Sequence, residues 1–215
     1  LQYSAGVNVM CQHLYAYSIR GQRKRDYPAN YSEHLPWQNA MKEFNEYFNR
    51  LGLILSLGNE VVNTLIIHPI HSAYLTYKRE EDLESIRPLE ESFGGTTNFF
   101  SEHQIPYHYG DEELMEKYGS VCGDKIKIGL CEYKYVVLPL TYTLEPATVK
   151  LLKEFVDNGG KVFLNGDAPT RIGGRPADLS WLKSNISFPE IRNDANVIMS
   201  QSGNLCNGVK CMTRD

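Results

Sequence analysis

The chain has 215 residues, of which 42% are hydrophobic and 22% charged, and its formal net charge is −4. This length accommodates one ordinary domain, or one domain and part of another, and the composition supplies a sizeable apolar core. The acidic balance argues against a dedicated nucleic-acid-binding protein, since such proteins carry a basic excess that neutralises phosphates. The longest apolar stretch, residues 61–70, is interrupted by Asn63, His68 and Pro69 and is too short to cross a bilayer.

The cysteines predict neither a disulfide framework nor a zinc site, because their number is odd and no C-x-x-C pair occurs. They favour a reducing compartment slightly. The sequence begins at Leu1 with neither a signal peptide nor an initiator methionine, and we interpret this as a cut end. The compartment is therefore left open between cytoplasmic, periplasmic and secreted.

The first part of the chain predicts a strand, a long loop and a helix. Residues 7–12 are expected to form a short buried strand. Residues 20–26 are polar and basic, and residues 26–36 are rich in Pro, Asn, Ser and Tyr, as is typical of a long loop. Pro36 suits the first turn of a helix, and Gly58 is a natural stop. The helix is predicted over residues 37–55 from apolar side chains at helical spacing, which are Trp37, Ala40, Met41, Phe44, Phe48, Leu51 and Leu55.

From residue 59 onward, strand patterns alternate with helix patterns. This alternation predicts an α/β domain with a parallel sheet covered on both faces. Its central strands are expected at residues 61–68, 135–138 and 161–164, with a helix over 144–158 crossing between the last two. Residues 83–104 have a helical composition, but Pro88 and the Gly94-Gly95 pair predict two helical pieces separated by a loop. Shorter elements are expected at 106–109 (strand), 111–118 (helix) and 125–128 (strand).

Two segments resemble parts of large bacterial glycosidases. Residues 6–61, GVNVMCQHLYAYSIRGQRKRDYPANYSEHLPWQNAMKEFNEYFNRLGLILSLGNEV, are similar to the last strand, loop and helix of the catalytic (β/α)8 barrel in rhamnosidase-like enzymes with a family 2-type sugar-binding domain. Residues 133–169, YKYVVLPLTYTLEPATVKLLKEFVDNGGKVFLNGDAP, resemble the flavodoxin-like domain that follows that barrel, and the trimerisation domain of family 42 β-galactosidases.

The resemblance implies a barrel end in residues 1–58. It also implies a flavodoxin-like, amidotransferase-like three-layer α/β/α domain in residues 59–215, truncated at its C-terminus. The catalytic carboxylates of the family lie earlier in the barrel and match no position of this chain.

The loop after the predicted strand 7–12 holds the candidate sugar-binding residues. Substrates of (β/α)8 barrels bind at the carboxyl ends of the strands, so this loop is expected to face the sugar in the intact parent. Aromatic rings would stack on the sugar, while the other side chains would hydrogen-bond its hydroxyls or carboxylates. The stacking residues are Tyr15, Tyr17 and Trp37, and the polar residues are His13, Arg20, Arg23 and Asp26. The alternative is a solvated basic loop with buried tyrosines.

Other chemistries fit the sequence less well. An amidotransferase-like hydrolase needs a nucleophilic cysteine on a strand-to-helix turn, and the turns after Leu138 and Leu164 hold none. A phosphate-binding turn needs glycines, which are absent after residues 61–68. His68 and His71 lack further metal ligands at a suitable spacing, so local hydrogen bonds are expected for both. We therefore predict neither a cofactor nor a metal.

The sequence thus favours a part of a multidomain glycoside hydrolase whose α/β domain is non-catalytic and serves barrel packing or oligomerisation. The expected partners are carbohydrate, bound through the parent barrel, the remainder of the same polypeptide, and a second copy of the chain; nucleic acid and membranes are not expected. The alternative is an autonomous flavodoxin-like module that binds a nucleotide or acts as an amidotransferase-like hydrolase.

Overall fold

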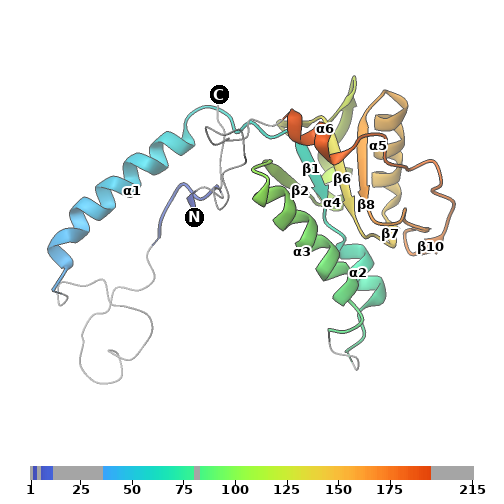
Figure 1. Ribbon diagram of the computed structural model, residues 1–215, viewed down its shortest axis with the longest axis horizontal. Coiled ribbons are helices and arrows are strands. Elements are labelled where there is room, and N and C mark those ends of the chain that lie inside the picture. Colours follow the sequence, from blue (N-terminus) through green and yellow to red (C-terminus); the bar gives the residue numbers. More distant parts are fainter. Residues whose placement is uncertain (1, 4–5, 12–35, 80–82, 195–215) are drawn as a thin grey trace. The chain divides into compact units, whose positions relative to one another are not determined.

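The computed structural model describes residues 2–3, 6–11, 36–79 and 83–194 (Figure 1). The chain divides into two compact units, one covering Leu1–Glu60 and the other Val61–Thr213, and each is described by itself. None of the described helices has the length and apolar character needed to cross a membrane.

The first unit is built around helix α1, Met41–Ser56, which follows the short 3-10 helix η3, Gln38–Ala40. The predicted helix is therefore present. The strand predicted over residues 7–12 is not, because residues 7–11 pair with no strand and are exposed, and residue 12 lies outside the described residues. A strand needs a neighbour for its backbone hydrogen bonds, and the described part of this unit supplies none.

The second unit contains a four-stranded parallel sheet, as predicted. The strand order is β2-β1-β6-β8, which matches the order 2-1-3-4 of flavodoxin-like folds. The strands are β1 Thr64–Ile67, β2 Tyr107–Gly110, β6 Tyr135–Pro139 and β8 Lys161–Asn165. Helix α5, Pro146–Asp157, crosses between β6 and β8 as expected. The α/β fold class is confirmed.

Strand β8 lies at an edge of the described sheet, and the prediction of a central position for it is wrong. Its outer backbone groups are satisfied by side chains instead of a fifth strand. The amide of Val162 donates to Asn185 Oδ1 at 2.7 Å, and the amide of Leu164 donates to Ser184 Oγ at 2.8 Å. Such a covered edge is protected from pairing with another chain.

The strands bury alternate side chains on opposite faces of the sheet, as their period of two requires. The first core contains Leu65 and Val136, together with residues of α5 and of α4, Glu112–Tyr118. The second core contains Ile66 and Val137, and it is covered by α3, Arg87–Glu102, and α6, Phe188–Asn193 (Figure 1). The result is a three-layer α/β/α arrangement.

Helix α3 runs without a break through Gly94 and Gly95, so the prediction of two helical pieces is wrong. Pro88 stands in the first turn, where its missing amide hydrogen costs nothing. The buried side chains of Leu89 and Phe100 anchor the two ends of the helix, and this tertiary packing overrides the low helix propensity of glycine.

Two small sheets complete the second unit. The antiparallel sheet β3-β4-β5 comprises Gly119–Cys122, Lys125–Ile128 and Cys131–Tyr133, and it adds Ile126 and Tyr133 to the first core. The other sheet, β10-β9-β7, comprises Arg175–Pro176, Arg171–Ile172 and Thr143–Leu144. Gly173 and Gly174 form the turn between β9 and β10 at φ 53° and 75°, the left-handed values of a type I′ hairpin.

Candidate functional site

The carboxyl edge of the parallel sheet is where this fold class binds ligands, at the point where the strand order reverses. Here that point lies between β1 and β6, which are neighbours in the sheet although β2 intervenes in the sequence. The segments that meet at this edge follow β1, β2, β6 and β8. The first of these segments is α2, Ile70–Thr76.

A buried carboxylate at this edge connects three of these segments. Glu112 opens α4, and its side chain is only 1% exposed. One oxygen, Oε1, lies 3.1 Å from His71 Nδ1 in α2, and the other accepts the backbone amide hydrogen of Glu145 at 2.7 Å, just before α5. Glu112 therefore holds α2, α4 and α5 together and fixes the orientation of the His71 ring.

The hydroxyl of Ser72 occupies the switch point itself. Ser72 is fully buried, and its Oγ accepts the amide hydrogens of Tyr142 at 3.0 Å and of Thr143 at 3.1 Å. The same hydroxyl lies 3.2 Å from the carbonyl oxygen of Thr143, to which it donates. A side chain of the protein thus satisfies backbone groups that a bound ligand would engage in an open site.

Helix α3 closes the opposite side of this edge in the same manner. Ser92 Oγ accepts the amide hydrogen of Leu140, which follows β6, at 2.8 Å. Asn165, the last residue of β8, donates from Nδ2 to Thr96 Oγ1 at 2.8 Å. The loops after β6 and β8 are consequently tied to α3.

Aromatic rings lie beside the ends of β1 and β2. The His68 ring meets that of Phe93 edge-on at 4.8 Å between centroids, and Phe93 in turn lies 5.4 Å from Tyr109. Burial, and then a hydrogen bond with Tyr107, raise the pKa of the Tyr109 hydroxyl to about 12, although the residue as a whole is 56% exposed. Tyr109 is accordingly a neutral hydrogen-bonding group over the whole physiological pH range.

The His71–Glu112 pair has the geometry of an oriented imidazole, as found in general-base dyads. A nucleophile is the further requirement of a hydrolase. The described cysteines are Cys11, Cys122 and Cys131, and none of them follows a strand of the parallel sheet. Within the described ranges, no three residues among His, Cys, Asp and Glu are grouped so that they hold a metal ion.

The predicted sugar-binding residues are mostly outside the described residues. This applies to His13, Tyr15, Tyr17, Arg20, Arg23 and Asp26, so their roles stay predictions. Trp37 is described; it directly precedes η3 and is 41% exposed. Trp37 is thus accessible for stacking, and its grouping with the other six residues stays a prediction.

The sequence does not predict the contact between His71 and Glu112. His71 was expected to bond locally, whereas its partner lies 41 positions further along the chain. The sequence contains one indication of this contact: His71 follows β1 and Glu112 follows β2, and the carboxyl ends of these neighbouring strands meet at one edge of the sheet.

No family model and no curated protein matches the chain. Among solved structures, it is similar to Gan42B, a GH42 β-galactosidase, at 19% sequence identity and a TM-score of 0.43 over 65% of this chain. It is also similar to a catalytic mutant of Gan42B, from G. stearothermophilus, at 16% identity and a TM-score of 0.44 over 66% of this chain. The chain spans about a fifth of either structure, 19% of its length. The similarity is distant and concerns a part of those β-galactosidases.

Proposed function

We propose that this chain is part of a multidomain glycoside hydrolase, in which residues 61–213 form a non-catalytic α/β domain that packs against a barrel or joins copies of the enzyme. The main support is the hydrogen bonding at the carboxyl edge of the sheet. Ser72, Glu112, Ser92 and Asn165 all bond to the chain's own loops and helices there. An edge closed in this way serves structural roles better than ligand binding.

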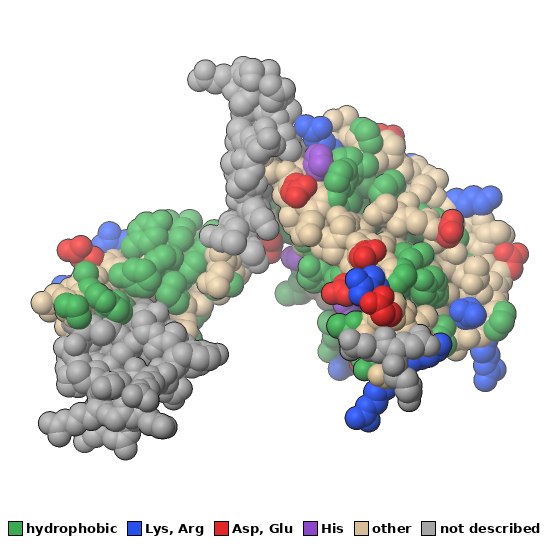
Figure 2. All heavy atoms as spheres, turned by 60° about the horizontal axis from the view of Figure 1, so that its bottom comes forward, with side chains coloured by type: hydrophobic (Ala, Val, Ile, Leu, Met, Phe, Trp, Pro, Cys, Tyr) green, Lys and Arg blue, Asp and Glu red, His purple; other side chains and the backbone are tan. Residues whose placement is uncertain are grey.

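The exposed apolar face of α1 agrees with this proposal. Helix α1 exposes Tyr47 by 62%, Leu53 by 61% and Ile54 by 64%. Hydrophobic side chains gather over this helix in Figure 2. Apolar surfaces of this kind usually contact a partner, and a barrel would supply one.

The site in the intact parent would use the residues predicted from the resemblance. Tyr15, Tyr17 and Trp37 would stack on the sugar. Hydrogen bonding falls to His13, Arg20, Arg23 and Asp26. The general acid and its partner carboxylate would come from earlier strands of the barrel.

The test offers a panel of nitrophenyl glycosides to the 215-residue chain and to the longer protein that contains the preceding barrel. We expect hydrolysis by the longer protein only, and a lower turnover when His13 or Arg20 is replaced by alanine. Glycosidase activity of the 215-residue chain itself would contradict the proposal. If the longer protein is active but His13→Ala leaves turnover unchanged, the loop assignment is wrong and the domain assignment stands.

A second candidate is an autonomous amidotransferase-like hydrolase, which the His71–Glu112 pair favours. That function predicts release of ammonia from glutamine, and it predicts that His71→Ala abolishes the release. We expect no such activity, because the turns after β6 and β8 present no cysteine to the imidazole.

A further inference from the structure

Helix α1 carries two adjacent apolar stripes, and only one of them is covered. The covered stripe contacts the N-terminal segment: the ring of Tyr3 lies 5.2 Å from that of Phe48. A Cβ on Gly52 would lie 2.2 Å from the carbonyl oxygen of Asn8, so glycine is required for this close approach. The Asn8 side chain also donates to Ser56 Oγ at 3.1 Å.

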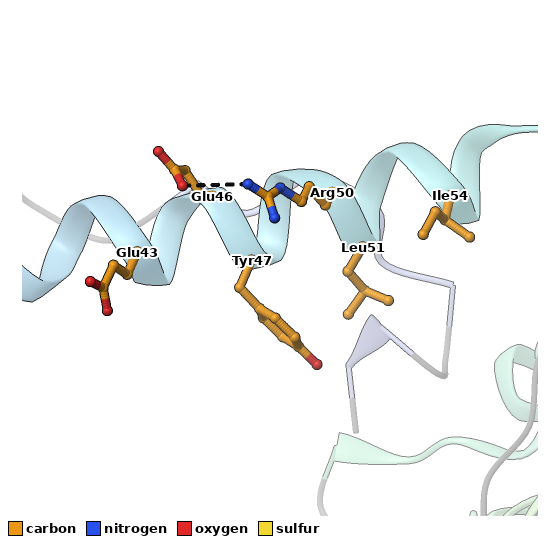
Figure 3. Close-up of a pocket in the computed structure, with 6 residues that line it drawn as sticks. All are labelled: Glu43, Glu46, Tyr47, Arg50, Leu51 and Ile54. Carbon is orange, nitrogen blue, oxygen red and sulfur yellow. Dashed lines mark ion pairs between the residues drawn. The ribbon is translucent and has the colours of Figure 1, made fainter.

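The second stripe is accessible, and we call it the open seam. It consists of Phe44, Tyr47, Leu51 and Ile54, at successive spacings of three, four and three residues. Phe44 is 41%, Tyr47 62% and Ile54 64% exposed. Tyr47, Leu51 and Ile54 project from one side of the helix and line a shallow depression of about 450 Å3 (Figure 3). This alternation of three and four residues is the pattern by which two helices pack along a shared seam.

The charges beside the open seam favour a particular orientation of the partner. Glu43 and Arg50 are seven residues apart, so they lie on the same border of the seam. When two copies of the helix pack antiparallel about a two-fold axis, this border of one helix faces the same border of the other helix. Glu43 then lies opposite the partner's Arg50, and Arg50 opposite the partner's Glu43.

A parallel arrangement lacks this complementarity. It would bring the border with Glu43 and Arg50 against the border that contains Phe48, which carries no charge and packs against Tyr3. Within one chain Arg50 already pairs with Glu46 at 3.6 Å, but both side chains are exposed, at 79% and 49%. Exposed pairs of this kind are weak, so Arg50 can exchange its partner.

We propose that a second copy of this chain packs antiparallel on the open seam of α1. Phe44 contacts the partner's Tyr47, Leu51 contacts the partner's Ala40, and two Glu43–Arg50 ion pairs flank the interface. The interface is symmetric, since each helix contributes the same surface. The 215-residue chain lacks the barrel that the proposed function would place on Tyr47 and Ile54, so in this chain the same face is available to a second copy, and the interface uses only contacts that the chain itself provides.

Sedimentation equilibrium of the 215-residue chain, from micromolar to millimolar concentration, tests the association. The average mass should rise from 24.5 kDa towards twice that value. Tyr47→Asp should abolish the rise, because it buries a charge in the seam, and the largely exposed position of Tyr47 leaves the fold intact by circular dichroism. A monomer at every concentration overturns the proposal, as does a dimer that Tyr47→Asp leaves unchanged.

Charge exchange tests the orientation. Glu43→Arg and Arg50→Glu should each weaken dimerisation, on the order of threefold to tenfold, because each places like charges opposite one another twice. The double variant should restore the wild-type dissociation constant. Lys42→Glu is the matched control, since it changes the net charge as Arg50→Glu does but lies away from the seam. A double variant as weak as the single ones overturns the antiparallel arrangement.

Discussion

Thr148 in α5 is fully buried, and its hydroxyl is the one buried side-chain polar atom in the described part of the chain that has no hydrogen-bond partner. A buried, unpaired hydroxyl costs free energy, and valine has nearly the same shape. Thr148→Val should therefore raise the free energy of unfolding by about 1 kcal/mol in urea titrations. Thr143→Val is the control, because Thr143 Oγ1 accepts the amide hydrogen of Gly174 at 3.0 Å. That variant should lose about 1 kcal/mol, and equal effects of the two would contradict the argument.

Glu112 should be among the residues most sensitive to substitution. Alanine would leave the Glu145 amide buried without an acceptor and would release His71, at a cost of about 2–4 kcal/mol. Glutamine retains a side-chain oxygen for the amide hydrogen, so Glu112→Gln should cost about half as much. Thermal and urea unfolding of the two variants measure the difference. Equal losses would mean that packing, and not the hydrogen bond to Glu145, makes Glu112 important.

Asp194 gives the second unit a pH-dependent contact after α6. Its carboxylate lies 3.0 Å from Lys134 Nζ and accepts the hydroxyl hydrogen of Tyr135 at 2.9 Å. The hydrogen bond with Lys134, more than that with Tyr135, lowers the pKa of Asp194 below its ordinary value of 3.8. A lowered pKa means that the ionised form favours the folded state, so the stabilisation is complete above about pH 4. It is lost as the pH falls through the folded-state pKa.

Asp194→Asn should accordingly lower the stability near neutral pH and have no effect in strong acid. The decrease should be less than about 1 kcal/mol, because both charged side chains are 38% exposed and the pair is screened by water. Urea titrations of the wild type and the variant between about pH 7 and pH 2.5 measure it. A difference that persists at the acidic end would show that the ionised carboxylate is not its source.

At the scale of elements, the centre of α3 contains two glycines that lower the stability of the helix. Gly94 and Gly95 lie in mid-helix, and a Cβ added at either would meet no atom within 4 Å. Alanine there loses less conformational freedom on folding than glycine does. Gly94→Ala and Gly95→Ala should each stabilise the protein by up to about 1 kcal/mol, as measured by thermal unfolding. Gly160→Ala is the control: its Cβ would lie 2.3 Å from the Phe155 ring, so it should destabilise.

Three strands of the parallel sheet, β1, β6 and β8, were predictable because their sequences are mainly apolar, as strands covered on both faces require. The positions of β1, β6 and β8 and the crossover helix α5 follow from such runs and from Pro146 and Gly159-Gly160 at the helix ends. The edge position of β8 did not follow, since it depends on Ser184 and Asn185, which are distant in sequence. Propensity alone also failed for α3, where packing outweighs two glycines.

The apolar pattern of the sequence does not predict helix α6, although the sequence contains a capping signal for it. Ser187 and Glu190 form a reciprocal capping box, and Pro189 stands in the first turn. The helix has only six residues, so periodicity does not reveal it. Its Ile191 is nevertheless 1% exposed and belongs to the second core. At this length the cap, and not the apolar pattern, identifies the helix.

The candidate site was less predictable than the fold, because side-chain contacts between distant segments make it. Sequence reasoning places His71 after β1 and Glu112 after β2, but only the strand order makes them neighbours. No sequence pattern predicts that the Ser72 hydroxyl bonds to the backbone of Tyr142 and Thr143. The sugar-binding loop rests on a resemblance, and of its residues only Trp37 is described.

At the scale of the whole molecule, both cores belong to the second unit. Every residue of the first and second cores lies between Val62 and Ile191. In the first unit, by contrast, Tyr3 is the one large side chain that is buried among the described residues. The described part of the first unit therefore buries too little apolar surface to be stable alone. The two units should therefore contribute very unequally to stability.

Residues 61–215 expressed alone should fold as the second unit does in the full chain. Their core is complete without the first unit, so the urea midpoint of the single cooperative transition should match that of the 215-residue chain. Residues 1–60 alone should show no cooperative transition, because the described residues of the N-terminal segment contact α1 mainly through Tyr3 and Asn8. Trp181 packs against the first core, so its fluorescence follows the second unit specifically once Trp37 of the first unit is replaced by phenylalanine in the 215-residue chain. If the free energy of unfolding of residues 61–215 is lower than that of the 215-residue chain by more than about 1 kcal/mol, the first unit stabilises the second. The same result would mean that α1 is a structural part of the α/β domain and not a helix whose apolar surface contacts a separate partner.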